Sequence, residues 1–280
     1  IINSEFNKKH FILNYKLILS FFVLLFLIEN LILYNLRKDI IIKEKSYKNK
    51  NNDYIYFDYG NYEKEFITDK IKTKAGFELG IDEVYFLNGL IRKIKPRHCL
   101  EVGTSRGGSA IIILNALKDI ENSFLISLDI NTYFYKNKTF KTGYRVKKFF
   151  PELANKWKIF TGKQPHQFLD KLQIKFDFLF LDTVHSAPGE IINLIEILPF
   201  LKDNSVIVMH DIVYHMKKEK KFIPSNIYLF PLIFGDKILI KKKISNIGAV
   251  FLYNNQSNHY LDYFLLLLSP WQYMPNKKNR

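Results

Sequence analysis

The feature that most constrains the fold is a regular alternation of short apolar runs with amphipathic stretches, which begins near Gly76. The apolar runs have the length of strands, and most of them end in a polar residue. Strands that alternate with helices predict a parallel sheet covered by helices on both faces. Ligands bind such sheets at the carboxyl ends of the strands, so the polar strand ends are the residues to examine. The expected strands are His98–Gly103, Phe124–Ile130, Trp157–Gly162, Phe176–Asp182 and Asn204–Asp211.

The apolar spacing predicts a helix over Ile81–Lys95, and residues 106–119 and 188–201 are also expected to be helical. Two further strands are predicted near the C-terminus, at Lys237–Lys241 and Gly248–Tyr253. The connection between them is too short for a crossover helix, so this pair should be antiparallel. The predicted fold class is therefore α/β, with a mostly parallel sheet that ends in an antiparallel C-terminal strand pair.

Changes in composition along the chain suggest four parts. Residues 1–36 are expected to form an apolar helix, 37–75 a charged linker, 76–255 the main domain and 256–280 an apolar tail. The longest uncharged run in the first part, Leu17–Ile28, is shorter than the roughly 20 residues that a bilayer span needs. Two interpretations stay open: a membrane-surface or signal-anchor helix, and a helix that docks on the domain or on a second copy of the chain.

The overall composition narrows the class of protein. With 48% hydrophobic and 25% charged residues, the chain is neither disordered nor a multi-span membrane protein. A single cysteine, Cys99, excludes a disulfide framework and a cysteine-rich zinc site. The net charge of +15 attracts anionic partners, but no arginine-rich cluster is present to bind phosphate, so we interpret it as a solvated lysine surface. We expect a cytoplasmic protein, associated with a membrane surface only if residues 10–36 act as an anchor.

A glycine-rich turn joins the first expected strand to the helix that follows. It runs from Glu101 to Ser109 and reads EVGTSRGGS. Such glycines let the backbone approach a ligand and expose amide N–H groups at a helix N-terminus. The spacing matches neither the dinucleotide fingerprint nor the phosphate-binding P-loop. Asp129 ends the next strand, where a carboxylate can bind the hydroxyls of a ribose; a capping role for this Asp is the alternative. Together, these features predict a nucleoside site.

This order of residues resembles the class I S-adenosylmethionine-dependent methyltransferases. Their opening pattern is E-x-G-x-x-x-G-x-S followed by an acidic end of the second strand, and an antiparallel last strand pair is also typical of them. The resemblance covers about residues 76–255 and points to the cephalosporin-hydroxylase-like or catechol O-methyltransferase-like branch. It implies a Rossmann-like methyltransferase sheet and S-adenosylmethionine as cofactor. The residues that we expect around the cofactor are Glu101, Gly103, Thr104, Ser105, Gly107, Ser109, Asp129, Gly162 and Asp182.

Two strand ends that should be neighbours carry the candidate catalytic residues, Asp182, His185, His210 and Asp211. In metal-dependent relatives, a similar spacing joins one metal carboxylate to an adjacent pair of ligands. The resemblance thus implies Mg²⁺ or another divalent cation at Asp182, His210 and Asp211. Because a histidine replaces a carboxylate at the second position, a metal-free site with His185 or His210 as general base is an alternative. A further alternative is that His210 and Asp211 only cap their strand.

The resemblance implies methyl transfer to an oxygen of a sugar or another small molecule. The stretch after the fourth strand reads DTVH rather than D/N-P-P-Y/F, which disfavours an amino-methyltransferase of nucleic acids. The alternative function is a methyltransferase-like subunit without catalysis that has a membrane-associated or assembly role. A homo-oligomer is compatible with either function.

Overall fold

The structure is a computed structural model that describes residues 64–184, 188–213, 225–240, 245–254 and 260–267. The chain divides into two compact units, residues 1–53 and 54–280, and all described residues belong to the second. The apolar helix expected within residues 1–36 lies outside the described residues. Among those that are described, no helix is both long enough and apolar enough to cross a bilayer.

The described residues form a seven-stranded sheet with the order β3-β2-β1-β4-β5-β7-β6. Its strands are β1 (His98–Val102), β2 (Phe124–Asp129), β3 (Trp157–Thr161), β4 (Phe176–Leu181), β5 (Leu201–His210), β6 (Gly235–Leu239) and β7 (Ile247–Leu252). Neighbours from β3 to β5 are parallel, whereas β7 runs antiparallel to both β5 and β6. The predicted fold class, a mostly parallel Rossmann-like sheet with an antiparallel end, is confirmed. Because β1 lies between β2 and β4, the chain winds outward from the middle of the sheet, where a crevice for ligands is expected.

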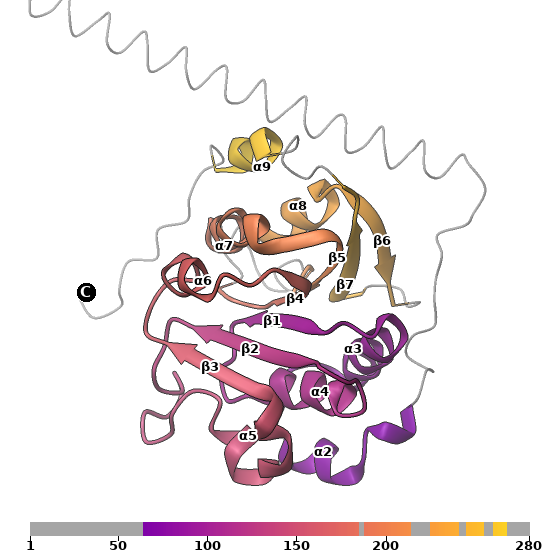
Figure 1. The fold of residues 1–280 in the computed structure, drawn as a ribbon, viewed down its shortest axis with the longest axis vertical. Coiled ribbons are helices and arrows are strands. Elements are labelled where there is room, and N and C mark those ends of the chain that lie inside the picture. Colours follow the sequence, from indigo (N-terminus) through magenta and orange to yellow (C-terminus); the bar gives the residue numbers. More distant parts are fainter. Residues whose placement is uncertain (1–63, 185–187, 214–224, 241–244, 255–259, 268–280) are drawn as a thin grey trace, which may run out of the picture. The chain divides into compact units, whose positions relative to one another are not determined.

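Helices cover both faces of the sheet (Figure 1). The helices are α2 (Asp69–Lys74), α3 (Ile81–Ile94), α4 (Gly108–Leu117), α5 (Tyr144–Phe149), α6 (His166–Leu172), α7 (Gly189–Ile197), α8 (Ser225–Leu232) and α9 (Tyr260–Leu266), with 3-10 turns η2 (Lys64–Phe66), η3 (Pro151–Lys156) and η4 (Leu198–Phe200). One face packs against α2 to α5 and the other against α6 to α9. Strand β4 shows the division: Phe178 and Phe180 face the first core, and Leu179 and Leu181 face the second. This alternation follows from the two-residue period of a strand.

Helix α4 fixes the end of the glycine-rich turn. Nearly all of its side chains are buried, including Ile111, Ile112 and Ile113, which are fully inaccessible to solvent. A helix that is apolar all round must be enclosed on all sides. Each such isoleucine stabilises the fold by about 1.5–3 kcal/mol through burial. The helix that begins at the turn is therefore firmly held.

The described part of the domain begins before Gly76. Residues 64–75, expected to end a linker, form η2 and α2, and they pack on the first core through Ile67 and Ile71. The Arg92 guanidinium lies 3.5 Å from the ring centroid of Phe66, which adds a cation–π contact. At the other end of the chain, Tyr263 of α9 is buried in the second core. Both segments thus contribute to the folded unit.

Candidate active site

A cavity of about 590 Å³ opens at the carboxyl ends of β1, β2 and β4. This is the edge of the sheet that the polar strand ends predicted. Much of its wall comes from the loop Gly76–Leu79, the turn Gly103–Arg106, residues 128–131 and residues 182–184. Further lining residues are Ser109, Tyr135, residues 163–165 after β3, and Gly189, Ile192 and Asn193 of α7. The loop Gly76–Leu79 precedes α3 and was not among the expected site residues. It packs closely on the start of α4, because a Cβ atom on Gly108 would lie only 2.4 Å from the Cα of Phe77.

Gly103 brings the glycine-rich turn unusually close to β4. Its φ is +93°, and a Cβ atom there would lie 1.7 Å from the carbonyl oxygen of Asp182. Its N–H donates to the Leu128 carbonyl, while the Asp182 N–H donates to the Val102 carbonyl. Only glycine meets both the backbone conformation and the close approach. Gly103 therefore holds the turn and the Asp182 strand end together.

Asp129 closes the turn from the neighbouring strand. One carboxylate oxygen accepts the N–H groups of Thr104 (3.0 Å) and Ser105 (2.9 Å), and the other accepts that of Asn131 (2.8 Å). The residue also lines the cavity and is partly exposed. Since a carboxylate accepts about four hydrogen bonds, ribose hydroxyls would share oxygens that already organise the turn. The capping role is thus present in the structure, and a role in ribose binding stays a prediction.

Glu101 lies beneath the turn, not in the cavity. It is fully buried and accepts hydrogen bonds from the hydroxyls of Ser109 and Ser127, both at 2.6 Å. The Trp157 indole in turn donates to Ser127 at 2.8 Å. Burial raises the pKa of the Glu101 carboxyl to about 7, although the serine donors oppose this shift. Glu101 is therefore linked to the cavity through Ser109, which lines it.

The other expected cofactor residues divide into two groups. Gly103, Thr104, Ser105, Ser109, Asp129 and Asp182 line the cavity. Of the described residues, Glu101, Gly107 and Gly162 are not among those that line it. Gly107 directly precedes α4 and has a φ of +96°. Gly162 donates its N–H to the Asp129 carbonyl, and its neighbour Lys163 lines the cavity. His185 lies outside the described residues.

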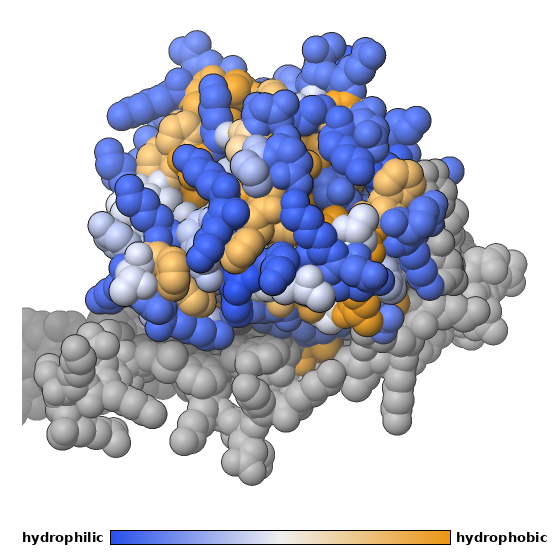
Figure 2. Space-filling view, turned by 90° about the horizontal axis from the view of Figure 1, so that it is seen from below, coloured by the Kyte–Doolittle hydropathy of each residue, from blue (hydrophilic) through white to orange (hydrophobic). Residues whose placement is uncertain are grey.

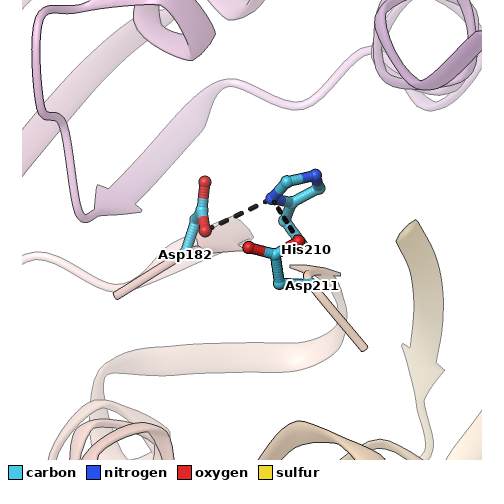
Figure 3. Close-up of side chains that lie close together, drawn as sticks. All are labelled: Asp182, His210 and Asp211. Atoms are coloured by element: carbon cyan, nitrogen blue, oxygen red, sulfur yellow. Dashed lines mark ion pairs between the residues drawn. The ribbon is translucent and has the colours of Figure 1, made fainter. Parts of the chain in front are cut away.

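The structure brings Asp182, His210 and Asp211 together at the ends of β4 and β5 (Figure 3). The His210 Nδ1 atom lies 3.3 Å from an Asp182 oxygen and 3.7 Å from an Asp211 oxygen. Asp211 also accepts a hydrogen bond from the Asn246 amide at 2.6 Å. Asp182 lines the cavity, whereas His210 and Asp211 are buried next to it. The cluster predicted from the spacing of these three residues is thus present.

Glu83 is a member of this cluster that the sequence analysis missed. Its carboxylate oxygen lies 3.2 Å from the His210 Nε2 atom and accepts the Gly80 N–H at 2.7 Å. Burial alone would lower the pKa of the His210 imidazole, but the carboxylates of Asp182, Glu83 and Asp211 outweigh it and hold this pKa well above its ordinary value. In the sequence, a Glu three residues after Gly80 signals only a helix N-terminus.

The three residues fit a divalent cation. Two carboxylates and one imidazole are a suitable donor set, and one ligand atom from each lies within 4.8 Å of the others. Glu83 holds the Nε2 side of His210 and leaves Nδ1 facing the two aspartates. A carboxylate behind a ligating histidine is a common arrangement at metal sites. Cation binding would have to displace a proton from His210.

The fold and the site have the features of a class I S-adenosylmethionine-dependent methyltransferase domain. Residues 100–212 match a family model described as a methyltransferase domain. This match runs from within β1 to just past the end of β5 and includes the turn, Asp129, Asp182, His210 and Asp211. The resemblance to methyltransferases expected from the sequence is confirmed over these residues.

Solved structures share the fold at low sequence identity. The SAH-bound methyltransferase PaMTH1 of Podospora anserina is 15% identical with a TM-score of 0.50, and the match covers 67% of this chain and 89% of that one. The O-methyltransferase TomG of Streptomyces achromogenes, in complex with SAM and involved in tomaymycin synthesis, gives the same identity and TM-score, with 67% and 91% covered. No curated protein matches the chain significantly.

Proposed function

We propose that the protein transfers the methyl group of S-adenosylmethionine to a hydroxyl oxygen of a sugar or another small molecule. The observation that carries this proposal is the single cavity into which the glycine-rich turn, Asp129 and Asp182 all open, with His210 and Asp211 directly behind Asp182. The residues proposed to bind the nucleoside and the residue proposed to accept a proton therefore line the same cavity. TomG, an O-methyltransferase involved in tomaymycin synthesis, has a similar fold, which supports an oxygen of a small molecule as the acceptor.

The chain's own residues would mainly bind and orient the two substrates. The sulfonium is itself electrophilic, so the protein contributes proximity, alignment and deprotonation of the acceptor. Asp182 reaches the cavity and would accept the proton of the acceptor hydroxyl, and His210 Nδ1, 3.3 Å away, would orient this carboxylate. If a divalent cation is bound, Asp182, His210 and Asp211 hold it, and it lowers the pKa of the acceptor hydroxyl.

Cofactor binding can be tested by calorimetry with two matched variants. Asp177→Ala is the control for Asp129→Ala. The Asp177 carboxylate also accepts two backbone N–H groups, those of Arg97 and His98, but these lie at the N-terminal end of β1, away from the cavity. We expect Asp129→Ala to weaken S-adenosylmethionine binding at least about tenfold, and Asp177→Ala to leave it unchanged. The cofactor assignment is wrong if the wild type binds nothing at millimolar cofactor.

Catalysis requires a separate experiment. Labelled cofactor is incubated with a cell extract, which is then fractionated into lipid, glycan, protein and nucleic-acid pools. We expect label in a glycan or small-molecule fraction, and we expect His210→Gln to lose this transfer while it still binds the cofactor. Cofactor binding without transfer to any pool would instead support the non-catalytic subunit.

A further inference from the structure

Residues 130–149, between the end of β2 and the end of α5, have an unusual composition. They contain six cations and six aromatic residues, and no acidic residue stands between Asp129 and Glu152. The cations are Lys136, Lys138, Lys141, Arg145, Lys147 and Lys148, and the aromatic residues are Tyr133, Phe134, Tyr135, Phe140, Tyr144 and Phe149. By comparison, lysines alternate with acids in KEFITDKIKTK at 64–74. We name this stretch the cationic-aromatic segment.

The cationic-aromatic segment folds into one continuous surface. Tyr133 and Lys141 pair in an antiparallel bridge, and the Phe134 N–H donates to the Phe140 carbonyl at 2.9 Å. The Phe140 ring stacks on that of Tyr144 in α5, with 4.4 Å between the centroids. The Lys148 ammonium of α5 lies 5.6 Å from the Phe140 ring centroid. This contact connects α5 to the loop that the bridge between Tyr133 and Lys141 closes.

The rings order this surface while the charges remain in solvent. Lys138, Lys141, Lys147 and Lys148 are exposed, and among the described residues none of them forms an ion pair. The face that carries α2 and α5 shows long hydrophilic side chains with hydrophobic ones between them (Figure 2). A preordered cationic surface loses little conformational entropy when it binds a partner.

Large apolar and aromatic side chains are exposed on the same segment. Ile130 is 55% exposed, Tyr133 47% and Tyr135 55%. Exposed tyrosines beside lysines suit the boundary between lipid head groups and acyl chains, where the rings enter and the ammonium groups meet anionic lipid. Five of the six cations are lysines, which attract a diffuse negative surface rather than grip single phosphates bidentately.

We propose that the cationic-aromatic segment binds the surface of a bilayer that contains anionic phospholipids. Ile130 and Tyr135 also line the cavity, so its mouth would then face the lipid surface. Backbone bonds from Gly143 to the Ser105 carbonyl (2.9 Å) and from Arg145 to the Arg106 carbonyl (3.1 Å) tie the segment to the glycine-rich turn. The proposal concerns binding alone and does not rest on the proposed enzymatic function.

The test is co-sedimentation of the full chain with vesicles of phosphatidylcholine, alone or mixed with phosphatidylserine. We expect phosphatidylserine to increase binding and high salt to reverse the increase. Replacing Lys138, Lys141, Lys147 and Lys148 with Gln should weaken binding to the mixed vesicles at least about tenfold. The control variant replaces four exposed lysines of other segments, Lys93, Lys95, Lys171 and Lys175, and should bind as the wild type does.

Three results would overturn the proposal. The first is binding that does not depend on phosphatidylserine. The second is an equal loss of binding in both lysine variants, which would indicate an effect of net charge alone. The third is single-stranded RNA that binds through the four segment lysines and displaces the vesicles, which would make the partner a nucleic acid. Tyr133→Ser supplies an independent measurement, because loss of the exposed ring should weaken vesicle binding severalfold even at unchanged charge.

Discussion

The two halves of the candidate site are built by different means. The turn half consists of Glu101–Ser109 with Asp129, and its backbone N–H groups are held by a carboxylate one strand away. The histidine half consists of Asp182, His210 and Asp211 with Glu83, and it depends on side chains from three distant elements. Local sequence therefore specifies most of the turn half, whereas long-range packing assembles the histidine half.

The same contrast appears in the two buried ionisable groups. Glu101 has hydroxyl neighbours, and burial outweighs their hydrogen bonds and raises its pKa to about 7. His210 has three carboxylates around it, which outweigh burial and raise its pKa. Burial always disfavours the charged form, and the charge of the neighbours decides which form remains. The pKa of Glu101 is thus raised by burial, and that of His210 by the charge of its neighbours.

The largest expected effect comes from Gly103→Ala, because this glycine joins the two halves. A Cβ would overlap the Asp182 carbonyl and oppose a φ of +93°. We expect a loss of at least about 3 kcal/mol in the free energy of unfolding, measured by urea denaturation. Gly162→Ala is the control: its φ is +88°, but its Cβ would meet only the Thr132 hydroxyl, at 3.1 Å. That variant should lose about 1 kcal/mol, and equal losses in both would contradict the joining role of Gly103.

A pH series isolates the turn half. The Glu101 pKa is raised from 4.5 to about 7, so the folded chain keeps a proton that the unfolded chain releases. Its contribution to stability is fully present below pH 4.5 and falls by about 3 kcal/mol as the pH rises through 7. Glu101→Gln should remove this decline, as measured by unfolding at pH 4.5, 6 and 7.5. His210 has a raised pKa and contributes its own decline, but only above pH 6.5. An unchanged slope between pH 4.5 and 6.5 in the variant would show that Glu101 does not titrate there.

Glu83 variants test the histidine half and should have the smallest effect on stability. Glu83→Ala removes one of the three carboxylates around His210 and the acceptor for the Gly80 N–H. Because Asp182 and Asp211 remain, we expect a loss of about 2 kcal/mol in unfolding free energy. Glu83→Gln keeps a hydrogen-bonding group and should lose less than about 1 kcal/mol. Since the gain of a proton by His210 depends on these carboxylates, NMR should show a lower His210 pKa in both variants. An unshifted pKa would exclude Glu83 from the cluster.

Much of the fold was predictable because it repeats a local signal. Each of the seven expected strands is present, although β5 begins at Leu201 instead of Asn204 and β6 at Gly235 instead of Lys237. The short connection before Gly248 required an antiparallel pair. Of the candidate site, Gly103 to Ser109 and Asp129 were predictable because they follow strand ends that parallel pairing brings to one edge. Asp182, His210 and Asp211 met for the same reason, since β4 and β5 are neighbours.

Other parts of the site had no local signal. Glu83 is 127 residues from His210, and only the packing of α3 against the sheet brings them together. The burial of Glu101 beneath the turn could not be inferred either, because the sequence does not tell whether a Glu near the end of a strand points into the cavity or away from it. The packing of residues 64–75 on the core depends on Ile67 and Ile71, two apolar residues in a segment otherwise typical of a linker.

The sequence by itself determined the parallel sheet, its antiparallel end and the edge at which a cofactor would bind, because hydrophobic period and turn chemistry act over a few residues. The tertiary structure alone decided which of the candidate residues reach the cavity, that Asp129 already holds the turn, and that Glu83 completes the His210 cluster. Burial and side-chain orientation arise from contacts between residues far apart in the chain, and no short stretch of sequence encodes them.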